Sequence, residues 1–175
     1  MKHDTSQYQF ELASSGDNAA ILHLFNKVTE TLLTNGIDQW DGTYPTLDII
    51  SKDIQSSNCW ILKDREDIIA SFVLNEEQDV QYDQIQWQYH GRVAVLHRVA
   101  VSPNSQGKGI GKALCHFAED SARSMGYQII RLDTYSRNPV SNNLYQSLGY
   151  KKAKGLCYFH GNKTPFYCYE KALSL

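Results

Sequence analysis

Apolar residues recur along this chain in two rhythms, every second position in some segments and every third or fourth in others, which predicts alternating strands and helices. From Ile21 to Leu32 the apolar side chains fall on one helical face, and Gly36 follows as a stop signal. The predicted elements are, in order, a strand over 8–13, a helix from 15 to 36, a short helix from 44 to 54, strands over 59–63 and 68–74 joined as a hairpin, a strand over 92–101, a helix over 109–125, a strand over 128–135, a helix from 138 to 149, and strands over 150–158 and 165–170.

This order of elements predicts a mixed α/β (α+β) fold, a mixed sheet with helices packed on it. The β-branched run at 92–101 is typical of a buried central strand. Segment 75–91 is polar, with Trp87 and Tyr89 interleaved, and is expected to be a loop. Asn138 followed by Pro139 is a favourable helix start, because Asn caps the helix and Pro suits its first position.

Length, charge and the lengths of apolar runs limit the number of domains and the kinds of partner that this chain is expected to have. With 175 residues, the chain is expected to form a single domain over 1–175. A net charge of −2 disfavours nucleic acid as the main partner. No apolar run approaches the roughly 20 residues that span a bilayer, so no membrane partner is expected. The first seven residues lack an apolar signal core, which makes the cytoplasm the expected location.

The four cysteines, at 59, 115, 157 and 168, form no C-x-x-C pair. No metal site is therefore expected, and in a cytosolic protein the thiols should be free.

The most informative segment is the glycine-rich turn from Val101 to Lys112, which joins the β-branched strand to a long helix. Glycines let the backbone approach a ligand, and the N–H groups and dipole of a helix start favour an anion there. This predicts a phosphate cradle with Lys108 and Lys112 at its rim. The alternative is a turn that merely tightens strand-to-helix packing. The Walker pattern fails because position 106 is Gln, and the dinucleotide pattern fails at Lys112.

The run Gln106-x-x-Gly109-x-Gly111 resembles the Q/R-x-x-G-x-G/A motif of the GCN5-related N-acetyltransferase (GNAT) superfamily. Val101, five positions earlier, matches the apolar residue of that motif. A second family pattern, N-x-x-A-x-x-L-Y-x-x-x-G-F, is matched at Asn138, Leu144, Tyr145 and Gly149, with Ser141 and Tyr150 as mild departures. Each motif lies on the expected element, and the order of elements is similar to the family's over essentially the whole chain.

The resemblance implies the GNAT fold, a central, mixed and mostly antiparallel sheet of about six or seven strands flanked by about four helices. It also implies acetyl-CoA as the cofactor, bound where the fourth and fifth strands splay apart. The backbone of Val99, Ala100 and Val101 would then bind the pantetheine arm. Asn138 would touch the cofactor, and Tyr145 would lie near the thioester sulfur. The pyrophosphate would be held by the turn, made of Gln106, Gly107, Lys108, Gly109, Ile110, Gly111 and Lys112.

The implied activity is transfer of an acetyl group to a primary amine by direct attack in a ternary complex. A lysine-like amine is only about 0.1% neutral near pH 7.4, so a base must remove its proton. His97 is the candidate base and Tyr145 the candidate general acid for the leaving thiolate. Asp133, Glu76 or Glu77 and a water chain remain alternatives for the base. A strand histidine held by a neighbouring group remains the alternative role of His97.

The acceptor is expected to be a small-molecule amine or a peptide amine. Trp40 and Tyr44, in the loop between the first two helices, are candidate acceptor-site residues, as are Trp87 and Asp133. Packing of the aromatic residues within their own loops is an equal alternative. A homodimer is a further expectation from the family. The competing function is a non-catalytic acyl-CoA-binding module that acts as a sensor or interaction partner, and the presence of Tyr145 argues for catalysis.

Overall fold

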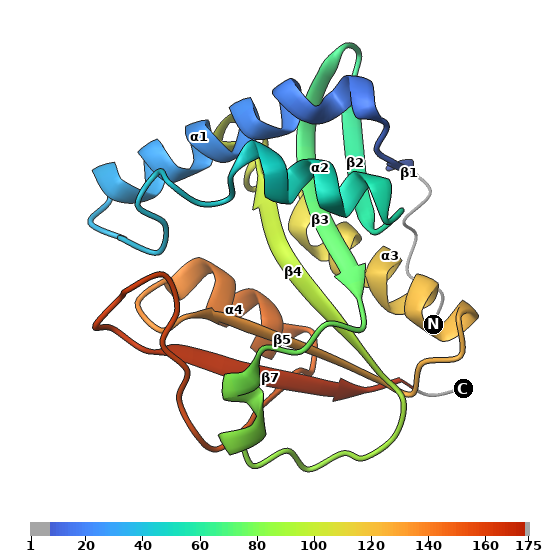
Figure 1. Cartoon of the computed structure of the whole chain (residues 1–175), viewed down its shortest axis with the longest axis vertical. Helices are drawn as coiled ribbons and strands as arrows, with labels where there is room; N and C mark the ends of the chain where they lie inside the picture. The colour runs from blue at the N-terminus through green and yellow to red at the C-terminus, as the bar shows by residue number, and fades with distance from the viewer. Residues whose placement is uncertain (1–7, 174–175) are drawn as a thin grey trace. The chain divides into compact units, whose positions relative to one another are not determined.

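The structure, a computed structural model, describes residues 8–173, and Figure 1 draws their secondary structure. Within this range the strands are hydrogen-bonded in the order β1-β2-β3-β4-β5-β7-β6, a seven-stranded mixed sheet, and four α-helices accompany them. The predicted mixed α/β fold is therefore confirmed. The first seven residues, which argued against a secretion signal, lie outside the described range.

The chain divides into two compact units that are interleaved in the sequence. One comprises the chain up to Leu74 together with Arg98–Phe117, and the other comprises Asn75–His97 together with the chain from Ala118. Strand β4 (Val93–Val101) and helix α3 (Ile110–Ser124) contribute residues to both. The expectation of a single domain stays a prediction.

Besides parts of β4 and α3, the first unit contains two whole helices and a set of antiparallel strands. These elements are β1 (Phe10–Leu12), the 3-10 turn η1 (Ser15–Asp17), α1 (Asn18–Thr34), α2 (Leu47–Gln55), β2 (Cys59–Asp64), β3 (Asp67–Asn75) and the 3-10 turn η3 (Pro103–Ser105). The last residue of β3, Asn75, belongs to the second unit. Helices α1 and α2 lie side by side (Figure 1). The predicted apolar face of α1 is buried, from Ile21 to Val28, and packs into one core with Trp40 and the β2 residue Ile61.

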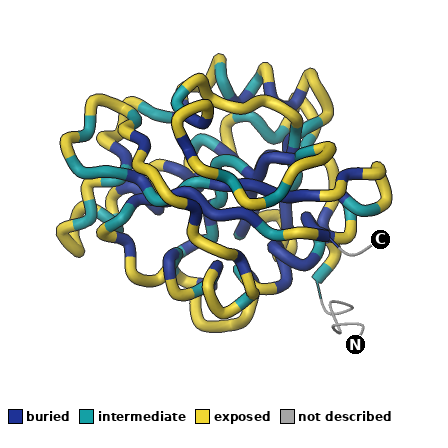
Figure 2. The backbone as a smooth tube through the Cα atoms, turned by 90° about the horizontal axis from the view of Figure 1, so that it is seen from below, coloured by how far each residue is buried: buried dark blue, intermediate teal, exposed yellow. Residues whose placement is uncertain are grey.

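The second unit is built on the pair β5 (Ile129–Tyr135) and β7 (Phe166–Ala172), antiparallel over seven positions. Helix α4 (Pro139–Ser147) packs on β5, and β6 (Lys151–Lys152) pairs with β7. The N-terminal part of β4 runs parallel to β5, with Val93–Val95 opposite Ile129–Arg131, and β5 continues to Tyr135. In Figure 2 the buried stretches of the backbone are dark blue, and the outermost loops are mostly yellow, that is, exposed.

Two predicted segments differ from the structure. The expected strand over 150–158 is reduced to Lys151–Lys152, because Gly155 has a φ of 121° and lies against Ile85, whose Cδ1 would be 2.8 Å from an added Cβ. The chain there forms only isolated bridges, such as Lys154 with Gln86. The expected loop over 75–91 contains a short 3-10 helix, η2 (Val80–Gln84).

Candidate functional site

The glycine-rich turn has the backbone that the cradle prediction requires. Gly107 and Gly109 have φ of 77° and 80°, the left-handed region that side-chain-bearing residues avoid. An added Cβ at either would meet no atom within 4 Å, so the glycines are required by conformation and not by crowding. The surface outside this turn is therefore open to a ligand.

The start of α3 supplies donors next to these glycines. The first helical hydrogen bond runs from Ala113 N–H to the Gly109 carbonyl at 3.0 Å, so the N–H groups of Ile110, Gly111 and Lys112 precede it. Such groups, with the helix dipole, suit an anion. Lys108 and Lys112 are exposed beside them, and Gln106 is exposed at the preceding turn. The turn thus fits the diphosphate of a nucleotide-containing cofactor.

A residue outside the motif also holds this turn. The Tyr8 hydroxyl donates a hydrogen bond of 2.7 Å to the carbonyl of Lys108, which lies between the two glycines of positive φ. No sequence pattern connects residues 100 positions apart, so this contact could not be predicted.

The second half of β4 leads into the turn. Val99 and Val101 are half-buried and Ala100 is 2% exposed, while the Ser102 N–H bonds the Ile69 carbonyl of β3 at 2.8 Å. Their assignment to the pantetheine arm stays a prediction. Arg98, just before them, has a φ of 48°, a strained conformation inside a strand.

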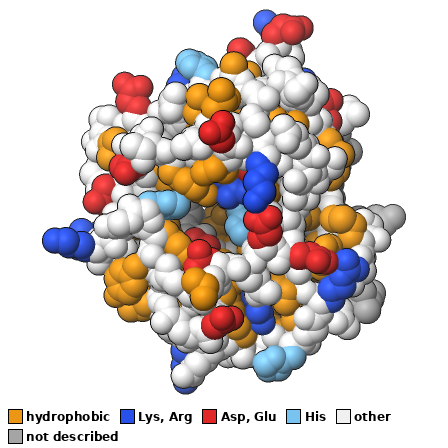
Figure 3. All heavy atoms as spheres, viewed as in Figure 1, with side chains coloured by type: hydrophobic (Ala, Val, Ile, Leu, Met, Phe, Trp, Pro, Cys, Tyr) orange, Lys and Arg blue, Asp and Glu red, His pale blue; other side chains and the backbone are white. Residues whose placement is uncertain are grey.

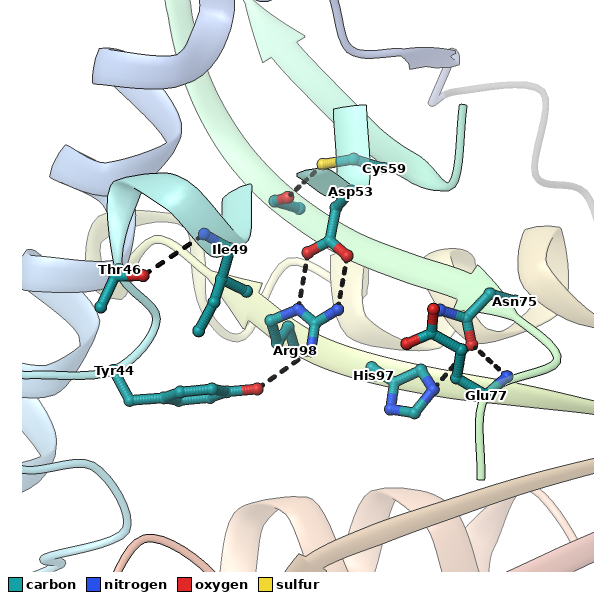
Figure 4. Close-up of polar contacts among 10 residues, drawn as sticks. Tyr44, Thr46, Ile49, Asp53, Cys59, Asn75, Glu77, His97 and Arg98 are labelled. Atoms are coloured by element: carbon teal, nitrogen blue, oxygen red, sulfur yellow. Dashed lines mark hydrogen bonds and ion pairs between the residues drawn. The ribbon is translucent and has the colours of Figure 1, made fainter. Parts of the chain in front are cut away.

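Arg98 is fixed by a buried ion pair from the predicted acceptor loop and α2 (Figure 4). Its Nε and Nη2 donate to the two carboxylate oxygens of Asp53 at 2.8 and 2.7 Å, and its Nη1 donates to the Tyr44 hydroxyl at 3.0 Å. Burial alone would lower the pKa of Arg98, but Tyr44 and Asp53 outweigh it and the pKa is raised. Tyr44 is thus held in place by β4.

Trp40 occupies the core of the first unit. It is 5% exposed, and its ring packs edge-on against Phe25 with centroids 5.4 Å apart. Such packing is the alternative to an acceptor contact, and the assignment of Trp40 to the acceptor site stays a prediction. Asp41 in the same loop accepts hydrogen bonds from the Thr43 N–H and hydroxyl at 2.9 and 2.6 Å, which shape the turn.

In the second unit, the candidate base His97 has a defined partner (Figure 4). Its Nε2 lies 2.9 Å from Oδ1 of Asn75, the last residue of β3, and that oxygen also accepts the Glu77 N–H at 2.9 Å. The alternative base Glu76 is engaged elsewhere. Hydrogen bonds from Tyr127 and Arg92 lower its pKa, which makes it a weaker base.

Asp133 and Trp87 are brought together through Tyr82. The Tyr82 hydroxyl donates to Asp133 at 2.7 Å, and its ring lies 5.2 Å from that of Trp87. Burial first, and Asp133 next, raise the pKa of Tyr82, so it stays a protonated donor. Arg131 stacks on Trp87 with its guanidinium carbon 4.1 Å from the ring centre. These contacts fix both predicted acceptor-site residues on one side of β5.

Helix α4 carries the second predicted motif. The Asn138 side chain caps the helix by accepting the Ser141 N–H at 3.2 Å, as predicted. Tyr145 is 4% exposed and its ring packs against Tyr150 and Tyr169. The cofactor contact of Asn138 and the acid role of Tyr145 stay predictions, and both residues belong to a different unit from the cradle.

A buried residue that no sequence pattern indicated, Asn142, holds this motif in place. Asn142 donates to the carbonyls of Tyr135 and Asn138 at 2.9 and 2.7 Å, and it accepts the Tyr169 hydroxyl at 2.7 Å. Its amide therefore ties α4 to both β5 and β7. A polar residue within a helix gives no signal of such a role.

The cysteines and His116 are not among the residues predicted for the cofactor and acceptor sites. Among residues 8–173, no cluster of His, Cys, Asp or Glu could hold a metal ion. All four cysteines are buried, and none of them is in a disulfide. His116, on helix α3, is buried, with 8% of its surface exposed. In the described range no helix has both the length and the apolar character needed to cross a membrane.

Charge is spread without a dominant sign. On the face in Figure 3, acidic and basic side chains are interspersed with apolar ones, in keeping with the net charge of −2.

Comparison with known proteins decides the family. The model of the acetyltransferase (GNAT) family matches residues 22–150, most of the chain and both motifs. The chain belongs to this family. It is an acetyltransferase, and the family uses acetyl-CoA.

Three relatives illustrate the match. The uncharacterized N-acetyltransferase YesJ of Bacillus subtilis (strain 168) is 25% identical over 162 residues, covering 90% of this chain and 86% of that protein. The crystal structure of a GNAT-family acetyltransferase from Streptococcus agalactiae has a TM-score of 0.79 at 21% identity, covering 96% of both chains. The structure of yncA from Salmonella typhimurium with its cofactor acetyl-CoA has a TM-score of 0.71 at 18% identity, covering 96% of this chain and 95% of that one. At these identities the two structures establish the fold alone.

Proposed function

We propose that this GNAT acetyltransferase is an N-acetyltransferase that acetylates a primary amine by direct attack in a ternary complex with acetyl-CoA. The observation that carries the proposal is the turn at Gly107 and Gly109, whose positive φ values leave an open, donor-rich surface at the start of α3. The N–H groups from Gly107 to Lys112 would hold the pyrophosphate. The backbone at Val99–Val101 would bind the pantetheine arm, and Asn138 would contact the cofactor from α4.

Two side chains would move protons. Acetyl-CoA, when bound, supplies the acetyl group: the amine nitrogen bonds the acetyl carbon, the carbon–sulfur bond breaks, and CoA leaves as a thiol. His97 would take the proton that the amine loses. The Tyr145 hydroxyl would give a proton to the leaving sulfur and recover one from solvent, and His97 would release its proton to solvent.

The acceptor would be a small-molecule or peptide amine. Tyr44, Trp87 and Asp133 are proposed as residues that recognise it, because each is only partly buried and is held by a named partner. Trp40 would support the loop from the core. Asp133 would add a negative charge that attracts a cationic amine. A cytoplasmic location and a homodimer remain part of the proposal.

The test is calorimetric titration of the folded protein with acetyl-CoA, with ATP and NAD as controls. ATP carries phosphates and adenine without the pantetheine arm, so selective binding of acetyl-CoA requires recognition beyond phosphate. Binding of ATP or NAD with equal affinity, or no binding of acetyl-CoA, would overturn the cofactor assignment to this turn. A panel of amine acceptors then follows with the release of thiol as readout. Tight binding without turnover on any amine would favour the non-catalytic acyl-CoA module.

A further inference from the structure

The side chains of Asn75, at the end of β3, and His97, on β4, are hydrogen-bonded to each other (Figure 4). The surroundings of this hydrogen bond determine which of the two atoms is the donor. The Glu77 N–H can only donate, so the Asn75 side-chain atom 2.9 Å from it must be the carbonyl oxygen Oδ1. If the Asn75 amide were flipped, its NH2 group would face the Glu77 N–H, and two donors would be in contact. The orientation of the Asn75 amide is therefore fixed by the backbone two residues later.

The same oxygen determines where His97 carries its proton. Oδ1 only accepts, and it lies 2.9 Å from His97 Nε2, so that nitrogen must bear a hydrogen and donate it. A neutral imidazole has one N–H, and its other nitrogen holds the lone pair. In neutral His97 the lone pair is consequently on Nδ1.

We propose that Asn75 is a positioning residue that keeps neutral His97 in the Nε2–H tautomer, so that Nδ1 is the atom that accepts the amine proton. This inference rests on the proposed function, in which His97 is the general base. The proton leaves the amine nitrogen and binds Nδ1. The resulting imidazolium carries a hydrogen on both nitrogens, and Nε2–H continues to donate to Asn75, so the ring need not turn during the reaction.

The chain offers matched variants for a test. Asn75→Ala removes the acceptor, whereas Asn75→Asp keeps an oxygen that accepts from both His97 and Glu77. Asp79→Ala is the control for a loop defect, because Asp79 Oδ1 accepts the Gln81 N–H at 2.9 Å in the same 75–91 segment. His97→Gln reports on the base itself.

The first readout is ¹⁵N NMR of the histidine side chains of the native protein, with His97 assigned by comparison with His97→Gln. We expect a protonated Nε2 and an unprotonated Nδ1 in the wild type and in Asn75→Asp and Asp79→Ala. Asn75→Ala should show a mixture of tautomers. A wild-type His97 with its proton on Nδ1 would overturn the inference without any variant being needed.

The second readout is steady-state kinetics. Asn75→Ala should lower kcat about tenfold with little change in KM. Asn75→Asp should keep most of the wild-type kcat, and the kcat of Asp79→Ala should equal that of the wild type. If His97→Gln loses activity while Asn75→Ala keeps its tautomer and kcat, the base stands and the role of Asn75 is wrong. If His97→Gln keeps full activity, the base assignment fails, and with it the catalytic role of Asn75.

Discussion

Arg98 and Asp53 form a two-pronged ion pair in which each carboxylate oxygen accepts one guanidinium N–H, at 2.7 and 2.8 Å, with the side chains only 13% and 10% exposed. The pair joins α2 to the one residue of β4 whose φ is positive. A planar guanidinium matches a carboxylate in this geometry, and lysine would not. The strained backbone at Arg98 is thus anchored by a side chain from another element.

Asp53→Asn should destabilise the protein by about 3 kcal/mol, because it leaves the buried guanidinium without a counter-charge. Chemical denaturation at neutral pH measures the loss. Asp120→Asn is the matched control, since Asp120 accepts from Arg123 at 2.6 Å but is 71% exposed. The control should change stability by no more than about 0.5 kcal/mol. Equal effects of the two variants would show that burial of the Asp53 pair is unimportant.

Gly109→Ala should weaken acetyl-CoA binding about fivefold, because alanine at a φ of 80° costs about 1 kcal/mol and drives the turn toward another conformation. Gly36→Ala serves as its control. Gly36 ends α1 with a φ of 73° and equally open surroundings, so it should lose similar stability and keep the Kd of acetyl-CoA. Calorimetry on both variants separates the two effects, and unchanged affinity in Gly109→Ala would remove the turn from the cofactor site.

Tyr145→Phe should lower kcat by about two orders of magnitude while the Kd of acetyl-CoA changes less than about twofold, if the hydroxyl donates to the leaving sulfur. Tyr150→Phe is the comparison, because Tyr150 is 3% exposed and its ring touches that of Tyr145. It should keep turnover. A parallel loss of turnover and affinity in Tyr145→Phe would leave Tyr145 with a packing role only.

Asp17 should make stability depend on acid pH. Burial opposes its charged form, but hydrogen bonds from Ser14 and Lys63 outweigh this and lower its pKa below 3.8. A lowered pKa in the folded state means that the contribution is complete above the ordinary value and is lost as pH falls through the folded one. Asp17→Asn should therefore cost about 1 kcal/mol near pH 7, and the difference from wild type should shrink near pH 3. Urea unfolding at both pH values checks this, and a constant difference would contradict it.

The thiols should be unreactive in the native protein. Burial raises the pKa of Cys59 to about 11, and it also raises those of Cys157 and Cys168. A disulfide reagent such as DTNB should thus label almost nothing near neutral pH until denaturant exposes all four cysteines. Released CoA could then be followed by colour in the presence of native enzyme. Rapid labelling of one cysteine, located by peptide mass, would contradict the prediction.

Local patterns predicted most of the elements and the glycine-rich turn, because periodicity, caps and glycine spacing are properties of short segments. The turn at 106–111 could be predicted for this reason, and its positive φ values agree with the glycines there. The contacts that hold the site are long-range. Asp53 and Arg98 are 45 residues apart in the sequence, and Asn75 and His97 are 22 residues apart. No local sequence pattern therefore indicates that either pair is in contact. The positive φ at Arg98 lies in a β-branched run that indicates only a regular strand.

The division of the chain has a consequence for dissecting the protein. The chain leaves the first unit for the second after Leu74, returns to the first after His97, and enters the second again after Phe117. Neither unit is a contiguous stretch, so no single truncation point yields either one intact. A fragment that stops near Phe117 would carry 75–97 without the β5 and β7 strands of its own unit, and only a permuted or spliced gene could encode one unit alone.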